Sequence, residues 1–352
     1  MCYYGSDTIT MTTIQHVAKR AGVAPITVSR VINKSGYVTQ PVRERVEAAI
    51  AESGYVPNGL ARSLRSRRTH TLALVLTDIT NPFFTTVARG VEDAASDAGF
   101  MVILGNTDEA ETKERQYLQM LLQRQVDGIL LVPAGDATES LRVIQQQKTP
   151  VVVLDRRVGT TDVDVVRCDS VGGAYQLGSL LASLGHRNIA VIAGPSKLSN
   201  SEDRVSGFQR SLAEAGLGHN VSGFHEGIAP VYYGTLTQES GYTMTQDALS
   251  VMPRPTAIFA TNNFLAVGAL NALHDAGLRV PEDVALVAFD DLLPAFVPFP
   301  FLTVADQPAY EMGQKAVALL LKRLSGEDPE PFRETLLDSK LVIRRSSGDK
   351  RG

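Results

Sequence analysis

The sequence predicts an α/β protein in which a small N-terminal helix-turn-helix head precedes a larger body of two lobes with parallel sheets. The chain has 352 residues, which is enough for two or three domains. From residue 71 onward, short apolar runs alternate with amphipathic segments, which predicts βαβ units and buried parallel sheets. The net charge of −4 divides into −1 from Asp7, +7 over residues 11–70 and −10 over residues 71–352. This division is typical of a nucleic-acid-binding module joined to a second domain, although a solvated basic face would carry the same charge.

The N-terminal segment and the cysteines narrow the class of protein. Residues 1–10 contain neither a basic nor an apolar run, so we interpret them as a disordered leader or as sequence before a start at Met11, and not as a secretory signal. No stretch approaches about 18 unbroken apolar residues, so we expect no membrane span. Cys2 and Cys168 are too few for a disulfide framework or a four-cysteine zinc site. We expect a protein of the reducing cytoplasm without metal or cofactor.

Residues 12–33 predict two short helices joined by a tight turn. Thr13 is the predicted N-cap, and Gly22 allows the positive φ that a tight turn requires. Pro25 suits the first position of the second helix, because its missing N–H would have no partner there. A third helix fits residues 41–53. The apolar residues at helical spacing, which would form the inner faces, are Ile14, Val17, Ala18, Ala21, Val28, Val31, Ile32, Val42, Val46, Ala49 and Ile50.

The second of these helices carries the candidate DNA contacts. In a helix-turn-helix, the N-terminal residues of the second helix face the base edges of the major groove. Thr27 and Ser29 can bind phosphates, Arg30 can pair bidentately with guanine, and Ile26 can contact a thymine methyl group. The alternative for Arg30 is a surface salt bridge. The residues predicted against DNA are Pro25, Ile26, Thr27, Ser29 and Arg30.

Several motifs of the head resemble the LacI/GalR (lactose/purine repressor) family of bacterial transcriptional regulators. The motifs are Val17-Ala18, Ala21-Gly22-Val23, Thr27-Val28-Ser29-Arg30-Val31, Asn33 and Gly54-Tyr55-Val56-Pro57-Asn58, and the resemblance covers most of residues 12–345. It implies a λ-repressor-like DNA-binding domain over residues 11–56, with Asn33 as a further contact. Two positions depart from the family pattern: Ala24 stands where Ser is common, and Gly59 stands where a better helix former is usual.

Residues 57–70 resemble the family's hinge helix and linker. An isolated helix over residues 57–64 is marginal in water, so we expect it to fold on binding DNA. By resemblance, Leu64 from each of two subunits wedges into a minor-groove base step and kinks the duplex. The alternative is that Leu64 packs against the body. The resemblance adds Asn58, Ala61 and Arg62 to the DNA contacts.

Residues 71–345 are predicted to form an effector-binding and dimerisation body. Its strands are expected at the apolar runs 71–77, 101–104, 128–132, 150–154, 188–192, 257–260 and 284–289. The resemblance implies a fold similar to periplasmic sugar-binding proteins, in which the chain crosses between the lobes three times. We place the crossings near residues 168–169, 303–307 and 330. This placement assigns residues 71–168 and 306–330 to lobe 1, residues 169–303 and 331–345 to lobe 2, and residues 346–352 to a tail.

Polar residues just after the strands are the candidate ligand contacts, because ligands bind at the carboxyl ends of parallel strands and between domains. The resemblance matches the Phe83–Phe84 pair and Arg204 to effector contacts. Leu236 falls where an aromatic ring often stacks on the ligand, and Asn263 replaces the usual Asp. The complete set is Asp78, Asn81, Phe83, Phe84, Asp155, Asp169, Arg204, Leu236, Asn262 and Asp290. Several of these residues could have a structural role instead. The two phenylalanines could lie in the core, and Arg204 could form an ion pair. The residues that could cap helices are Asp155, Asp169 and Asp290.

The chain lacks the Walker A, GxGxxG and GxSxG motifs of nucleotide-dependent and hydrolytic enzymes. We therefore expect a sequence-specific transcriptional repressor that binds a pseudo-palindromic operator as a homodimer, and not an enzyme. A small effector between the lobes, a sugar, would control it; a purine or another metabolite is the alternative. A solute-binding protein would need a signal peptide in place of the basic head. The segments 82–98 and 109–124 are expected at the dimer interface.

Overall fold

The computed structural model describes residues 12–56, 68–159, 162–217, 229–292, 299–326 and 331–348. These residues form two compact units, one ending at Thr69 and the other beginning at His70. The expected leader and hinge helix lie outside the described residues, and with them Asn58, Ala61, Arg62 and Leu64. None of the described helices is long and apolar enough to cross a lipid bilayer.

The N-terminal unit contains three helices, α1 (Ile14–Ala21), α2 (Pro25–Ile32) and α3 (Gln40–Ser53). Gly22 ends α1 with a φ of 65°, the left-handed conformation that the turn before α2 requires. Val17, Val28 and Val46, one from each helix, are fully buried in a common core. The predicted helix-turn-helix is confirmed, and α3 begins one residue earlier than expected.

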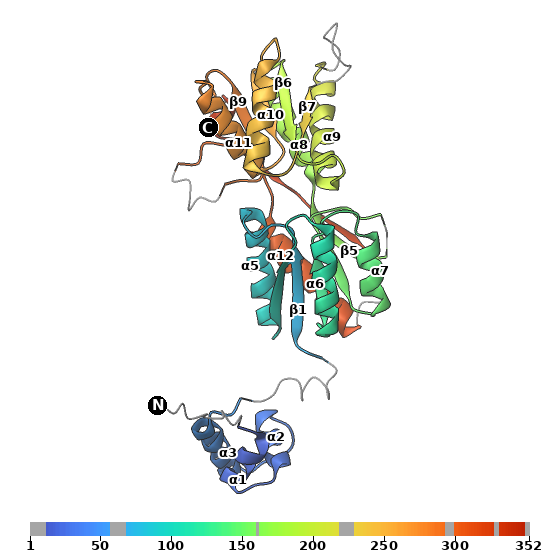
Figure 1. Ribbon diagram of the computed structural model, residues 1–352, viewed down its shortest axis with the longest axis vertical. Coiled ribbons are helices and arrows are strands. Elements are labelled where there is room, and N and C mark those ends of the chain that lie inside the picture. Colours follow the sequence, from blue (N-terminus) through green and yellow to red (C-terminus); the bar gives the residue numbers. More distant parts are fainter. Residues whose placement is uncertain are drawn as a thin grey trace, which may run out of the picture. The chain divides into compact units, whose positions relative to one another are not determined.

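Lobe 1 of the body is a six-stranded sheet covered on both faces by helices (Figure 1). Its elements are β1 (Thr71–Leu76), α5 (Pro82–Asp97), β2 (Met101–Asn106), α6 (Glu111–Gln123), β3 (Gly128–Leu131), α7 (Thr138–Gln146), β4 (Val151–Leu154), β5 (Asp164–Cys168), α12 (Ala309–Ser325) and β11 (Glu334–Leu337). The strand order is β11-β5-β4-β3-β1-β2, and every neighbouring pair is parallel. Helices α5 and α12 pack on one face, and α6 and α7 cover the other.

Lobe 2 repeats this design. Its elements are α8 (Ser170–Ser183), β6 (Ile189–Ala193), α9 (Ser199–Glu214), β7 (Val231–Tyr233), α10 (Gln238–Ser250), β8 (Ala257–Ala260), α11 (Asn263–Asp275), β9 (Ala285–Phe289), β10 (Thr303–Asp306), β12 (Lys340–Val342) and the 3₁₀ turn η1 (Arg345–Ser347). The strand order is β12-β10-β9-β8-β6-β7, with α8 and α9 on one face and α10 and α11 on the other. The β10–β12 pair is antiparallel, which differs from the all-parallel expectation.

The chain passes between the lobes at three places. It leaves lobe 1 after β5, returns after β10, and leaves again between β11 and β12. The expected third crossing near residue 330 is wrong, because β11 pairs in parallel with β5 inside lobe 1. Residues 334–337 therefore belong to lobe 1, and the crossing falls at residues 338–339. Asp306, which was assigned to lobe 1, ends β10 in the sheet of lobe 2.

The expected tail at residues 346–352 begins inside the folded body. Ser346 and Ser347 are fully buried in η1. The Ser346 hydroxyl donates to the carbonyl oxygen of Leu286 at 2.6 Å and accepts from the Thr303 N–H at 2.8 Å. The fold therefore extends at least to Gly348, because these hydrogen bonds connect the segment to β9 and β10.

Candidate DNA interface and interlobe site

The outer face of α2 holds the predicted base-reading residues. Val28 and Val31 point into the core, which leaves Pro25, Ile26 and Arg30 exposed. The side chain of Ile26 is 54% exposed, although burial of an isoleucine would be favourable. Within residues 12–56, Arg30 makes no ion pair, so the alternative of a salt bridge finds no partner there.

Two polar residues complete this face. Ser29 is half-buried, and the Asn33 side-chain amide donates to the Ser29 carbonyl oxygen at 2.8 Å. Asn33 thereby ends α2 as its C-cap residue. Ala24 is the N-cap residue of α2 and supplies no side-chain hydrogen bond. Its carbonyl oxygen accepts from the Thr27 N–H at 2.9 Å, and Pro25 has no N–H, so the first turn of α2 offers an anion only the Ile26 N–H.

Arg204 and Asp290 lie at the centre of a buried polar group in lobe 2. The Arg204 guanidinium is 3.5 Å from the Asp290 carboxylate, donates to the Thr261 carbonyl oxygen at 2.7 Å, and stacks on the Phe289 ring. Burial raises the pKa of Asp290 to about 6, against the opposing effect of the Arg204 charge. The amide of Gln307 donates to Asp290 at 2.6 Å. Among the described residues, the Asp290 carboxylate contacts Gln307 and Arg204, and neither contact caps a helix.

Asp155 reaches this group from lobe 1. It follows β4 with a φ of 65°, and Asn200 on α9 donates to its carboxylate at 3.0 Å across the lobe boundary. Burial raises the pKa of Asp155, and the charges of Arg156 and Arg204 oppose that shift. Arg156 is itself held by Glu109, with nitrogen–oxygen distances of 2.6 and 2.8 Å. Among the described residues Asp155 accepts no capping hydrogen bond, and its carboxylate instead contacts lobe 2 through Asn200.

A second bridge between the lobes consists of two amides. Asn81 and Asn263 donate to each other, with distances of 3.3 and 3.1 Å between the amide nitrogens and oxygens. Asn81 also caps α5 by accepting from the Phe83 N–H, and Asn262 caps α11 by accepting from the Leu265 N–H. Both residues are buried.

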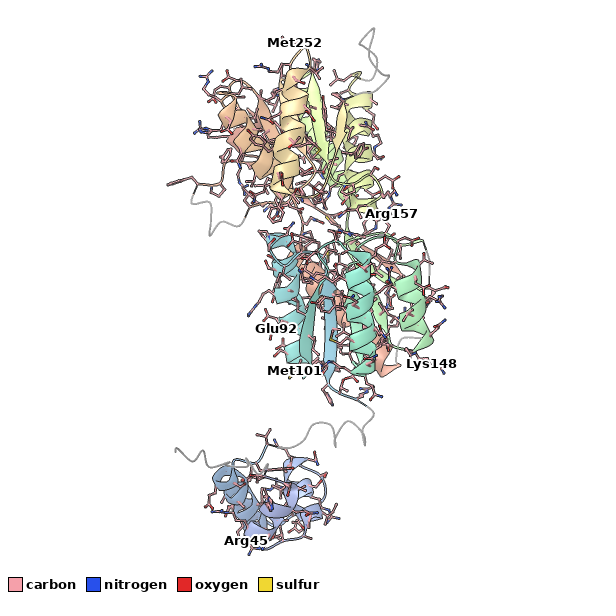
Figure 2. The ribbon with its side chains drawn as sticks, viewed as in Figure 1. Arg45, Glu92, Met101, Lys148, Arg157 and Met252 are labelled. Carbon is pink, nitrogen blue, oxygen red and sulfur yellow. The ribbon has the colours of Figure 1, made fainter. Side chains whose placement is uncertain are left out.

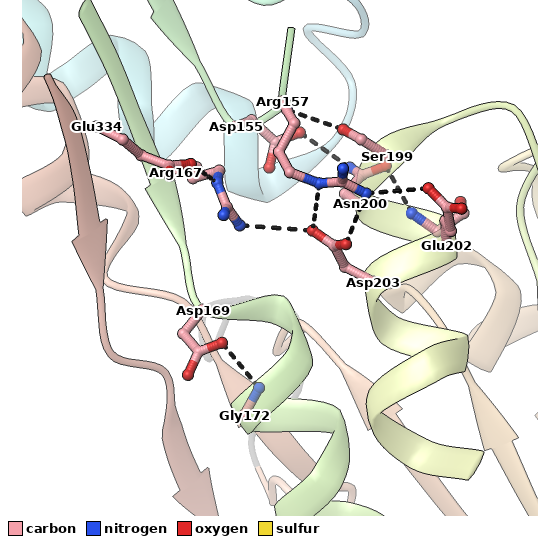
Figure 3. A network of polar contacts seen from close by, with 11 residues as sticks. Asp155, Arg157, Arg167, Asp169, Gly172, Ser199, Asn200, Glu202, Asp203 and Glu334 are labelled. Atoms are coloured by element: carbon pink, nitrogen blue, oxygen red, sulfur yellow. Dashed lines mark hydrogen bonds and ion pairs between the residues drawn. The ribbon is translucent and has the colours of Figure 1, made fainter. Parts of the chain in front are cut away.

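Four further residues predicted as effector contacts have partners within their own lobe. Phe83 and Phe84 are buried in the core of lobe 1, which is the alternative considered for them. Asp169 caps α8 by accepting from the Gly172 N–H at 2.8 Å (Figure 3). Asp78 accepts from the Thr80 N–H and hydroxyl in a local turn.

The half-buried Leu236 packs on the apolar cluster that α10 and α11 form over the sheet of lobe 2. Its side chain approaches Gly194 so closely that a Cβ there would lie 2.4 Å from the leucine methyl group. Cys168 is buried, and burial raises its pKa to about 12, so its thiol stays protonated near neutral pH. Among the described residues no group of three His, Cys, Asp or Glu side chains could hold a metal ion.

Asn200 and Gln307 contact Asp155 and Asp290, and the sequence predicts neither of these contacts. Gln307 directly follows β10, so the rule that selects polar residues after strands would have found it if β10 had been recognised. Asn200 follows no strand, because it lies in the first turn of α9. Only the apposition of the two lobes brings it to Asp155.

Comparison with known protein families decides the class of protein. Residues 13–58 match the model of bacterial regulatory proteins of the lacI family. Residues 69–343 match the model of periplasmic binding proteins and the sugar binding domain of the LacI family. The chain belongs to the LacI family. It is therefore a DNA-binding transcriptional regulator and not an enzyme.

Several family members match nearly all of this LacI-family chain. The HTH-type transcriptional repressor PurR of Photobacterium profundum is 34% identical and covers 96% of this chain and 99% of its own. A complex of the transcriptional regulator CelR with cellobiose is 34% identical, with a TM-score of 0.71 over 95% of this chain and 99% of its own. The Lac repressor dimer bound to operator and the anti-inducer ONPF is 27% identical, with a TM-score of 0.83 over 96% and 99%.

Proposed function

We propose that this chain is a repressor whose affinity for operator DNA is controlled by a sugar bound between the lobes. The observation that carries this proposal is a pair of buried polar atoms beside Asp290. Arg204 Nε and Gln307 Oε1 have no hydrogen-bond partner among the described residues. Buried polar atoms are nearly always hydrogen-bonded, so a donor and an acceptor in this position favour a ligand that offers both. Sugar hydroxyl groups do so.

The proposed effector contacts are the polar residues at the junction of the lobes. Asp155 and Asp290 would accept hydrogen bonds from hydroxyl groups, and Arg204 would donate to a hydroxyl or ring oxygen. Asn262 and Gln307 lie at the same edge of the lobe 2 sheet, because they follow the carboxyl ends of β8 and β10, which both run parallel to β9. The CelR–cellobiose complex supports a sugar, whereas the likeness to PurR keeps a purine or another metabolite as the alternative.

We propose that α2 enters the major groove, with Ile26 and Arg30 on base edges and Thr27 and Ser29 on phosphates. The operator would be pseudo-palindromic, because a two-fold dimer presents two identical heads. The Lac repressor dimer bound to operator supports this arrangement. Residues 57–70 are proposed as hinge and linker, with Leu64 as the wedge. The location would be the cytoplasm, where bacterial operator DNA is found.

The edge strand β2 of lobe 1 supports homodimer formation. Met101 is 70% exposed and Leu104 is 44% exposed on this strand. An exposed apolar edge strand is a favourable surface for association, and most soluble homodimers bury such patches. We propose that β2, together with the expected interface segments α5 and α6 that flank it on the two faces of the sheet, meets the same elements of a second copy.

A thermal-shift screen of the full chain against sugars and nucleosides tests the effector proposal. We expect a sugar to raise the melting temperature and to change operator binding at the same concentration. Arg204→Lys should abolish the shift, whereas Arg279→Ala, which removes an exposed arginine from lobe 2, should retain it. A shift produced only by nucleosides would favour the alternative effector, and a shift that survives Arg204→Lys would place the ligand elsewhere.

A further inference from the structure

A cluster of charged side chains joins the two lobes beside the interlobe site (Figure 3). Arg157 of lobe 1 lies 2.8 Å from Asp203 and 3.0 Å from Glu202, both on α9 of lobe 2. Arg167, also of lobe 1, lies 3.4 Å from Asp203. Each of these three contacts pairs a positive group of lobe 1 with a negative group of lobe 2, so all of them attract the lobes to each other.

The cluster is anchored on the strands that lead to the lobe crossings. Arg167 lies on β5, and its guanidinium also pairs with Glu334 on the neighbouring strand β11. The chain leaves lobe 1 directly after each of these strands. The side chains of Arg167 and Asp203 are only 13% and 12% exposed, so solvent screens their attraction less than it screens the 42% exposed Arg157.

The cluster also borders the proposed effector contacts in sequence and in space. Arg157 follows Asp155 by two residues, and Asp203 precedes Arg204. The Arg157 N–H donates to the Ser199 hydroxyl at 2.8 Å, next to the Asn200–Asp155 hydrogen bond. In Figure 2, Arg157 lies where the two lobes meet. The contacts of Arg157 and Asp203 are therefore well placed to influence the spacing between Asp155 on lobe 1 and Arg204 on lobe 2.

We propose that Arg157, Arg167 and Asp203 are positioning residues, which hold the lobes at the separation that lets Asp155 and Arg204 bind one effector molecule together. The proposal rests on the effector site proposed above, since positioning has meaning only if both residues contact the ligand. When fewer molecules present the two halves of a site at the right spacing, the apparent dissociation constant rises by the same factor. The cluster thus sets effector affinity without touching the effector.

Single-molecule energy transfer on the full chain tests the proposal without any ligand. Dyes are attached to Cys residues introduced at exposed positions of α7 and α9, by Gln146→Cys and Ala213→Cys, in a Cys2→Ser background. The buried Cys168 stays unlabelled. One labelled chain is diluted into unlabelled protein, so that only distances within a subunit are measured. We expect Arg157→Ala and Asp203→Asn to lower the ratio of close to separated lobes about threefold to tenfold.

Three comparisons make the measurement specific. Arg279→Ala removes an arginine–aspartate pair that lies within lobe 2, and it should leave the ratio unchanged. Asp203→Glu keeps the charge and should restore much of the ratio. Raising NaCl from low to high concentration should lower the wild-type ratio toward that of the variants, because salt screens the exposed part of the cluster.

Two outcomes would overturn the proposal. One is an unchanged distance distribution in Arg157→Ala, which alters a partly exposed side chain and leaves the fold intact. The other is an equal change in Arg279→Ala. A wrong assignment of the effector site would give a different result. Arg204→Lys would then still respond to sugar, while the distance measurement would give the expected shift.

Discussion

The outer face of α2 and the interlobe site differ in the exposure of their candidate binding side chains. On α2, the side chains of Arg30 and the apolar Ile26 are exposed and therefore accessible to a partner molecule. At the interlobe site, Arg204, Asp155 and Asp290 are buried and already contact other protein groups. In the proposed function, DNA recognition depends on the side chains that the head leaves exposed. The proposed binding of an effector would instead complete or replace hydrogen bonds that already exist within the protein.

The largest effect on folding stability is expected for a substitution of Arg204, which lies at the buried interlobe site. Arg204→Ala leaves Asp290 without its nearby cation and removes the stacking on Phe289. The substitution also removes the hydrogen bond to the Thr261 carbonyl oxygen, which Asp290→Asn would keep. Because a buried carboxylate is then left without a cation, the free energy of unfolding should fall by about 3–5 kcal/mol. Denaturant titration measures it. A loss below about 1 kcal/mol would mean that the pair is solvated in solution. Operator binding by the folded fraction should remain.

Asp290→Asn should stabilise the protein at neutral pH. The folded state raises the pKa of Asp290 from 3.8 to about 6, so it binds more protons than the unfolded chain between these values. Stability contributed by this group is therefore lost as the pH rises from about 4 to 6. The neutral Asn also tolerates the φ of 66° at this position. We expect a gain of about 1–3 kcal/mol in the free energy of unfolding at pH 7.5, which disappears near pH 4.

Thermal or urea unfolding of wild type and Asp290→Asn at both pH values checks this prediction. The variant should also lose its effector response, because a carboxylate is replaced in the site. An equal gain at pH 4 and pH 7.5 would contradict the role of ionisation.

Arg30→Ala tests the exposed side of the comparison. Because Arg30 makes no ion pair within the described head, folding stability should change by less than about 0.5 kcal/mol. Discrimination between operator and mismatched DNA should fall by about 1–3 kcal/mol, as expected for a bidentate base contact. Binding titrations on both DNAs measure it. An equal loss on the two DNAs would make Arg30 a phosphate contact.

The smallest effect is expected at the amide bridge. Asn263→Ala leaves the buried Asn81 amide without its reciprocal partner, which should cost about 1 kcal/mol of folding free energy. Asn81→Ser keeps a helix cap for α5 while removing the bridge, so a double-mutant cycle with Asn263→Ala isolates the contact between the lobes. Strictly additive effects would show that the bridge contributes nothing.

The sequence predicts the apolar strands because burial on both faces produces uninterrupted apolar runs. Five short strands were not predicted: β5, β7, β10, β11 and β12. They contain polar residues such as Asp164 and Arg167, and several lie at the edges of the sheets. Asp164 is fully buried, and Arg323 neutralises it from a helix far along the chain at 2.7 Å. A local pattern contains no sign of such a partner.

The sequence selects some of the residues that meet where the two lobes join, and it misses others; whether they bind an effector stays a prediction. The rule that selects polar residues after strands finds Asp155, Asn262 and Asp290, since each lies one or two residues after the end of a strand. Phe83 and Phe84 were assigned to the ligand by resemblance, and the structure buries them in the core of lobe 1. The contacts of Asn200 and Asp203 depend on how two separately folded lobes meet, which no spacing in the sequence records.

The interleaved path of the body determines how its parts can be exchanged between relatives. The head is one continuous segment, so a chimaera can take residues 12–56 from another chain with a single junction. Lobe 1 instead combines residues 71–168 with α12 and β11, and the far end of the chain adds β12 to the sheet of lobe 2 and η1 against β9. No single junction within the body separates one lobe from the other. New effector specificity must therefore be acquired by substitutions within the body or by replacing residues 70–348 as one block.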